Sequence, residues 1–104
     1  MGYDEIVDKV QAYSQRVVQR YHPKMIIVYG SYARGTATQD SDIDIAIICE
    51  SLGGDYMENA FELFRMRRDI DLRIEPVLIE PDNVRNSFYN DIIKTGKIVY
   101  TESA

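Results

Sequence analysis

The apolar residues of this chain recur with two different periods, and the change of period divides the chain into predicted helices and strands. Three segments repeat apolar side chains every three or four positions with charged residues between them, which is typical of amphipathic helices: residues 4–21, 55–68 and 82–94. Four shorter segments rich in Ile, Val and Tyr predict β-strands: residues 25–29, 43–49, 72–79 and 97–100. The predicted order is helix, strand, strand, helix, strand, helix, strand.

Elements in this order predict an α/β (α+β) fold, with about three helices packed on a small mixed β-sheet of about four strands. A chain of 104 residues can form one hydrophobic core, so residues 1–104 are expected to be a single domain. Hydrophobic residues make up 45% of the chain and charged residues 28%, and no linker-like segment interrupts it. This composition favours a folded globular domain.

Two carboxylates stand at the start of the second predicted strand. Asp42 and Asp44 are two positions apart, and side chains alternate across a strand, so both point to one face at a spacing of roughly 6.5 to 7 Å. Carboxylates aimed together without a basic neighbour repel each other unless a cation lies between them. A hard divalent cation with oxygen ligands is the natural occupant of such a site.

The first strand ends in a Gly-Ser turn that supplies a complementary feature. Gly30 has no Cβ to obstruct a ligand, and the backbone N–H groups that follow, with the Ser31 hydroxyl, can bind phosphate at the start of a short helix. Arg34 lies three residues further on. It is either a ligand of a triphosphate oxygen, a role that suits a guanidinium, or an exposed loop arginine, and the sequence leaves both open.

Gly30 and Ser31, ten intervening residues, and then Asp42-Ile43-Asp44 form one combined pattern. Each half alone is common, but the two at this spacing between apolar strands resemble the signature of the DNA polymerase β-like nucleotidyltransferase superfamily. The chain is most similar to the minimal nucleotidyltransferases, small single-domain members often paired with a helical HEPN partner. This resemblance implies ATP as substrate, Mg²⁺ as cofactor with two ions held by Asp42 and Asp44, and transfer of AMP to a hydroxyl with release of pyrophosphate.

The resemblance also implies a third metal-binding and catalytic carboxylate on a neighbouring strand. The candidates are Asp69, Asp71, Glu75 and Glu80. Alternation along residues 72–79 excludes neither Asp71 nor Glu75. The likeness of Arg73-Ile74-Glu75-Pro76-Val77 to the corresponding family segment favours Glu75, although the family more often has aspartate there. Pro76 removes a ladder donor and predicts an edge strand or a bulge.

Charge and composition narrow the classes of partner and compartment. Twelve basic against 17 acidic residues give a net charge of −5, which argues against DNA or long RNA as a substrate. The N-terminus lacks the features of a signal peptide, and no segment reaches a membrane-spanning length. The single cysteine, Cys49, falls in a predicted buried strand, which fits a reducing cytoplasm. A cytoplasmic location is therefore expected.

The acceptor hydroxyl is expected on another protein, because residues 1–104 leave no room for the helical substrate domain of larger family members. Resemblance to the minimal members implies a HEPN-type toxin that is adenylylated, with tyrosine as the expected acceptor, which would make this chain an antitoxin. Two alternatives stay open. One is nucleotidyl transfer to a small molecule, as in aminoglycoside modification, and the other is an antitoxin that neutralises its partner by binding alone.

Overall fold

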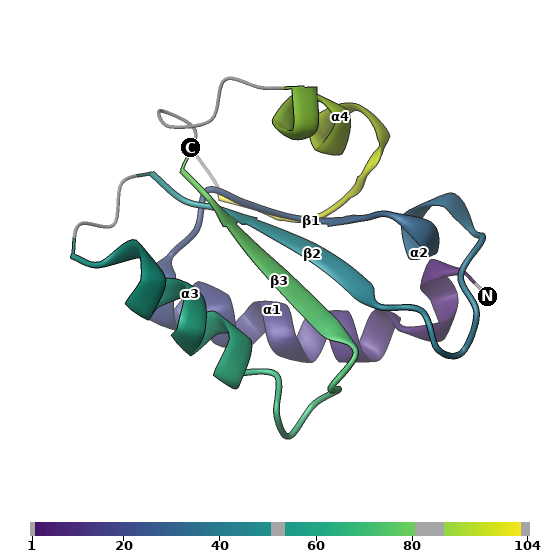
Figure 1. Cartoon of the computed structure of the whole chain (residues 1–104), viewed down its shortest axis with the longest axis horizontal. Coiled ribbons are helices and arrows are strands. Elements are labelled where there is room, and N and C mark those ends of the chain that lie inside the picture. Colours follow the sequence, from purple (N-terminus) through teal and green to yellow (C-terminus); the bar gives the residue numbers. More distant parts are fainter. Residues whose placement is uncertain (1, 51–53, 81–86, 103–104) are drawn as a thin grey trace.

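A single four-stranded mixed sheet forms the centre of the molecule (Figure 1). This computed structural model describes residues 2–50, 54–80 and 87–102. The strands are β1 (Met25–Tyr29), β2 (Ile43–Ile48), β3 (Ile74–Ile79) and β4 (Lys97–Thr101), in the order β3-β2-β1-β4. β1 is antiparallel to both β2 and β4, whereas β2 and β3 are parallel. The predicted mixed sheet is therefore confirmed.

Helices cover both faces of this sheet. They are a 3-10 turn η1 (Tyr3–Glu5), α1 (Val7–Tyr21), the short α2 (Ser31–Arg34), α3 (Tyr56–Arg65) and α4 (Ser87–Thr95). Figure 1 shows α1 and α3 beneath the sheet and α4 above it, so the α+β class is confirmed. Among the described residues, none of these helices combines the length and the apolar character needed to cross a membrane.

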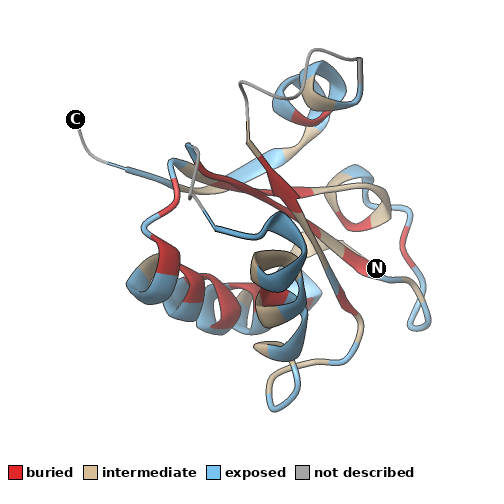
Figure 2. Cartoon of the chain, turned by 60° about the vertical axis from the view of Figure 1, so that its left-hand side comes forward, coloured by how far each residue is buried: buried red, intermediate tan, exposed pale blue. Residues whose placement is uncertain are grey.

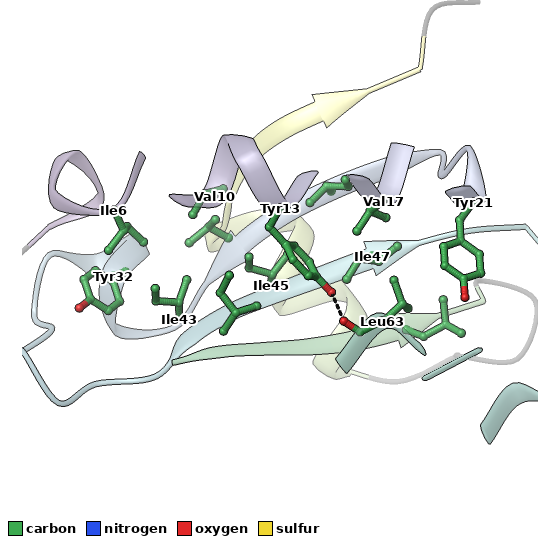
Figure 3. Packing of buried hydrophobic residues seen from close by; sticks show 14 of the residues in the cluster. Ile6, Val10, Tyr13, Val17, Tyr21, Tyr32, Ile43, Ile45, Ile47 and Leu63 are labelled. Atoms are coloured by element: carbon green, nitrogen blue, oxygen red, sulfur yellow. Dashed lines mark hydrogen bonds between the residues drawn. The ribbon is translucent and has the colours of Figure 1, made fainter. Parts of the chain in front are cut away.

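The larger core lies between the sheet and the pair α1 and α3. The inward face of β2 packs Ile43, Ile45 and Ile47 against an apolar stripe of α1. Figure 2 shows the buried segments of the strands and the buried positions that recur along α1. Tyr13 of this stripe donates its hydroxyl proton to the Leu63 carbonyl of α3 at 2.7 Å (Figure 3). Its ring is buried while its polar tip is satisfied, which ties the two helices together. Cys49 also belongs to this core, as expected.

Three sequence predictions need correction or limitation. The apolar spacing of Met57 and Phe61 predicts that they lie on the buried face of the helix at residues 55–68. This prediction is wrong, because Leu63 is the buried residue of α3, whereas Met57 and Phe61 are 60% and 57% exposed. The strand predicted from residue 72 begins at Ile74, since the segment before it forms turns. Residues 82–86 of the predicted last helix lie outside the described residues. The edge position predicted from Pro76 is confirmed, because β3 is an outer strand.

Candidate active site

The parallel pairing of β2 and β3 brings two of the predicted carboxylates side by side. Asp44 and Glu75 are Cα partners in this register. Partners in a parallel pair point to the same face of the sheet, and adjacent strands are about 4.8 Å apart. Because Ile43 and Ile45 face the core with α1, Asp44 and Glu75 face the opposite side, where α4 lies. Asp42 directly precedes β2 and completes a row of acids at this end of the sheet.

Gly30 allows the Asp44 carboxylate to lie directly against the turn that follows β1. Gly30 has φ +76° and ψ −151°, a backbone conformation that is essentially restricted to glycine. A Cβ at this position would lie 2.3 Å from Asp44 Oδ2, which is closer than real atoms approach. The turn that begins α2 and the Asp44 carboxylate of β2 therefore share one site. Ser31, the first residue of α2, is half-buried beside them.

Electrostatics at this site disfavour an ionised Asp44. Burial raises the pKa of the Asp44 carboxyl above its usual value, and the charges of Asp42 and Glu75 raise it further, while Arg34 lowers it. Burial also raises the pKa of the neighbouring Tyr29 to about 12, with added contributions from Asp44 and Glu75. Arg34 is exposed but close enough to act on Asp44. The site therefore combines excess negative charge with a nearby cationic side chain.

The donor set fits a hard divalent cation. Asp42, Asp44 and Glu75 offer only carboxylate oxygens, the ligands that Mg²⁺ takes in proteins. Within the described residues, no three His, Cys, Asp or Glu side chains lie close enough together to hold a metal ion as they stand. Asp42 and Glu75 are exposed, so rotation of their side chains can bring oxygens towards Asp44.

Asp71, the alternative third carboxylate, has a different partner. The Arg73 guanidinium donates to both of its oxygens, from Nε at 3.0 Å and from Nη2 at 2.7 Å, and the Arg73 backbone N–H donates at 2.9 Å. These bonds lower the pKa of the Asp71 carboxyl. Asp71 also precedes β3, so the alternation argument that placed it on the face of Glu75 does not hold. The geometry favours Glu75 as the partner of Asp44.

The other two candidates lie elsewhere. Asp69 pairs with Arg16 of α1, whose Nη2 donates to Asp69 Oδ2 at 2.8 Å. Glu80 follows the last residue of β3, at the opposite end of the strand from Glu75. Neither residue is near the row formed by Asp42 and Asp44 at the start of β2.

Arg73 also ties together the segments that carry the site, a role the sequence did not reveal. Its Nη1 donates to the Tyr32 hydroxyl at 2.9 Å and to the Gln39 carbonyl at 3.2 Å. The Tyr32 hydroxyl in turn donates to the Thr38 carbonyl at 3.2 Å, and the Tyr32 ring is buried. These bonds, with the Arg73–Asp71 pair, form what we call the Arg73 clamp. It joins α2, the loop before Asp42 and the start of β3.

Residues 13–104 match the family described as polymerase beta, nucleotidyltransferase. The chain belongs to this nucleotidyltransferase family. A Methanocaldococcus jannaschii protein provisionally named protein adenylyltransferase MJ1305 is 36% identical over 87 residues. That match covers 72% of this nucleotidyltransferase chain but only 56% of the relative's own length.

Another relative and two solved structures are also similar to this chain. A second M. jannaschii protein with the same provisional name, MJ0126, is 30% identical over 99 residues, which cover 90% of this nucleotidyltransferase and 93% of the relative. A provisionally assigned minimal nucleotidyltransferase structure has TM-score 0.67 and 18% identity, covering 92% of this chain and 94% of the other. A toxin-antitoxin structure with AMP-PNP has TM-score 0.65 and 22% identity, and the match covers 88% of this chain and 73% of the other. The two structural likenesses show the shared fold.

Proposed function

We propose that this nucleotidyltransferase moves AMP from ATP to a hydroxyl, with tyrosine as the expected acceptor, on a HEPN-type toxin and so acts as an antitoxin in the cytoplasm. The observation that supports this most strongly is the register of β2 and β3, which sets Asp44 beside Glu75 and against the Gly30 turn. The relatives named protein adenylyltransferase support protein as the class of acceptor. The toxin-antitoxin structural neighbour supports a toxin as the partner.

In this proposal Asp42, Asp44 and Glu75 hold Mg²⁺, with two ions expected. When bound, Mg²⁺ neutralises charge on the phosphates and on the attacking and leaving oxygens. The turn at Gly30 and Ser31 binds phosphate oxygens through backbone N–H groups. Arg34, exposed on the same side as Asp44, adds a guanidinium that can bind the triphosphate.

The proposed reaction is an in-line displacement at the α-phosphorus of ATP. The acceptor oxygen forms a bond to this phosphorus while the bond to the bridging oxygen breaks, and pyrophosphate leaves. The hydroxyl proton passes to the exposed Glu75 carboxylate. The chain thus contributes alignment and preorganised charge, and it forms no covalent intermediate of its own.

The test uses ATP labelled on the α-phosphate, Mg²⁺ and a lysate of the source organism. We expect the purified chain to label a protein, which mass spectrometry identifies as carrying whole AMP units on tyrosine. Label on a small molecule would instead support a small-molecule transferase. A stable complex with an unmodified partner would support neutralisation by binding alone.

Two carboxylate variants then test the third acid with the identified partner. Glu75→Gln should reduce the mass gained by the partner by at least about a hundredfold, as expected for loss of a group acting at the reacting centre. Asp71→Asn is the comparison variant and should have a smaller effect, because Asp71 binds Arg73 and acts on the site only through the Arg73 clamp. Both variants are assayed well below their melting temperatures. A stronger effect of Asp71→Asn would overturn the choice of Glu75 and leave the transfer activity standing.

A further inference from the structure

Two aromatic rings extend the candidate active site along the α4 side of the sheet. Tyr29 is the last residue of β1, directly precedes Gly30 and pairs in register with Asp44. Its ring meets the Phe88 ring of α4 edge to face, with centroids 5.7 Å apart and an interplanar angle of 85°. α4 covers this face of the sheet in Figure 1. The two rings therefore form an aromatic surface next to the carboxylates and the glycine turn.

Residues other than Phe88 anchor α4 in the small core above the sheet. The helix is held by Ile92, which is 2% exposed, and by Tyr89, and both pack on the small core above the sheet. Phe88 remains 43% exposed although its ring contacts Tyr29. An isolated exposed aromatic residue is ordinary. This ring differs because it packs against Tyr29, a direct neighbour of Asp44 and Gly30.

The groups already assigned to the site cannot distinguish one nucleotide from another. Carboxylates, a bound cation and backbone N–H groups contact phosphates, which all nucleoside triphosphates share. A nucleobase needs a flat apolar surface within one nucleotide's length of the phosphates, and aromatic side chains provide such surfaces. Among the described residues, the Tyr29–Phe88 pair is the aromatic contact next to the Gly30 turn.

We propose that Phe88, held by Tyr29, is the platform on which the nucleobase of the bound triphosphate stacks. The inference rests on the proposed function, because it takes a nucleoside triphosphate as the ligand. Purines stack over a larger area than pyrimidines, so ATP and GTP should bind more tightly than CTP and UTP. Phe88 is then a specificity residue that touches the base, outside the carboxylate row.

Calorimetric titration with two ligands tests this assignment. With Mg²⁺ present, Phe88→Ala should weaken ATP binding by roughly 5- to 100-fold, the range expected for loss of one base–aromatic stack. It should leave the affinity for tripolyphosphate unchanged, because that ligand has no base. Phe88→Trp, which keeps an aromatic ring at this position, should bind ATP about as tightly as the wild type does. Phe61→Ala is the matched control, since Phe61 is 57% exposed on α3, beneath the opposite face of the sheet.

Each outcome decides the proposal. Unchanged ATP affinity in Phe88→Ala, or equal affinity of the wild type for ATP and CTP, would overturn the stacking platform while the proposed function stands. Equal losses for ATP and tripolyphosphate would also overturn it, because Phe88 would then act by supporting the phosphate site. Failure of the wild-type chain to bind any Mg²⁺–nucleotide would instead count against the proposed function itself.

Discussion

At the scale of single residues, the site depends on a glycine that permits a close approach. Asp44 occupies the space where any other residue at position 30 would carry its Cβ. The sequence predicted that Gly30 leaves room for a ligand, whereas the structure shows that it also leaves room for the carboxylate itself. The turn and Asp44 are thus coupled in space although fourteen positions separate them in sequence.

Gly30→Ala should destabilise the domain and displace Asp44. The substitution adds a backbone cost of about 1–3 kcal/mol to a collision with the carboxylate. Gly35→Ala is the matched control, because Gly35 also has a positive φ, +78°, but nothing lies within 4 Å of its added Cβ. Thermal melts should show a larger loss for Gly30→Ala. Equal losses would mean that the contact with Asp44 has no energetic consequence.

Asp42→Asn combined with Asp44→Asn should abolish transfer and leave the metal-free fold at least as stable as the wild type. The native pKa of Asp44 is raised, so its ionised form is less favourable in the folded chain than in the unfolded one. This penalty is absent at pH values below the pKa that Asp44 has in the unfolded chain, and it appears as the pH rises through the higher pKa that Asp44 has in the folded chain. In thermal melts in EDTA from about pH 4 to 7, the melting temperature of the double variant should therefore rise relative to that of the wild type as the pH increases. A clear loss of stability would show that these acids support the fold.

At the scale of elements, the Arg73 clamp connects three segments whose relative positions define the site. Sequence patterns predicted β1 and the start of β2 at the residues where the structure has them. They did not predict the clamp, because a hydrogen bond between Arg73 and Tyr32 depends on pairing between β2 and β3. They also assigned the wrong face of α3, since the bulky Met57 and Phe61 outweighed the single buried Leu63.

Asp71→Asn should weaken this clamp in a pH-dependent way. The bonds from Arg73 lower the pKa of Asp71 in the folded chain. The stability that ionised Asp71 contributes is therefore fully present at pH values above its pKa in the unfolded chain, about 3.8. That contribution disappears as pH falls through the folded pKa. The wild type should therefore melt at a higher temperature than Asp71→Asn at neutral pH, and the difference should vanish in acid. A difference that persists unchanged in acid would contradict the ion pair as its cause.

Tyr32→Phe tests the second half of the clamp. Loss of the Tyr32 hydroxyl removes the bonds to Arg73 and Thr38 and should cost about 1–2 kcal/mol of unfolding free energy. If the clamp positions Asp42 relative to Gly30, the variant should also bind ATP with Mg²⁺ more weakly at temperatures where it is fully folded. Tyr100→Phe is a suitable control, since Tyr100 belongs to the edge strand β4. Unchanged ATP affinity would limit the clamp to a role in stability.

At the scale of the whole molecule, the sheet order decides where the chemistry lies. The sequence predicted the acids of β2 from their spacing, but the choice between Asp71 and Glu75 required the parallel register of β2 with β3. Alternation along one strand cannot supply that register. The family resemblance pointed to Glu75, and the fold now offers a geometric reason, because Asp44 and Glu75 are direct partners.

We expect the row of carboxylates beside the Gly30 turn to need a divalent cation before it can bind a polyanionic nucleotide. Calorimetric titration of the purified chain with ATP, first in EDTA and then in Mg²⁺, tests this most directly. We predict binding at least about tenfold tighter with Mg²⁺, and loss of that gain in Asp44→Asn but not in the distant Asp69→Asn. Equally tight ATP binding in EDTA would contradict the account.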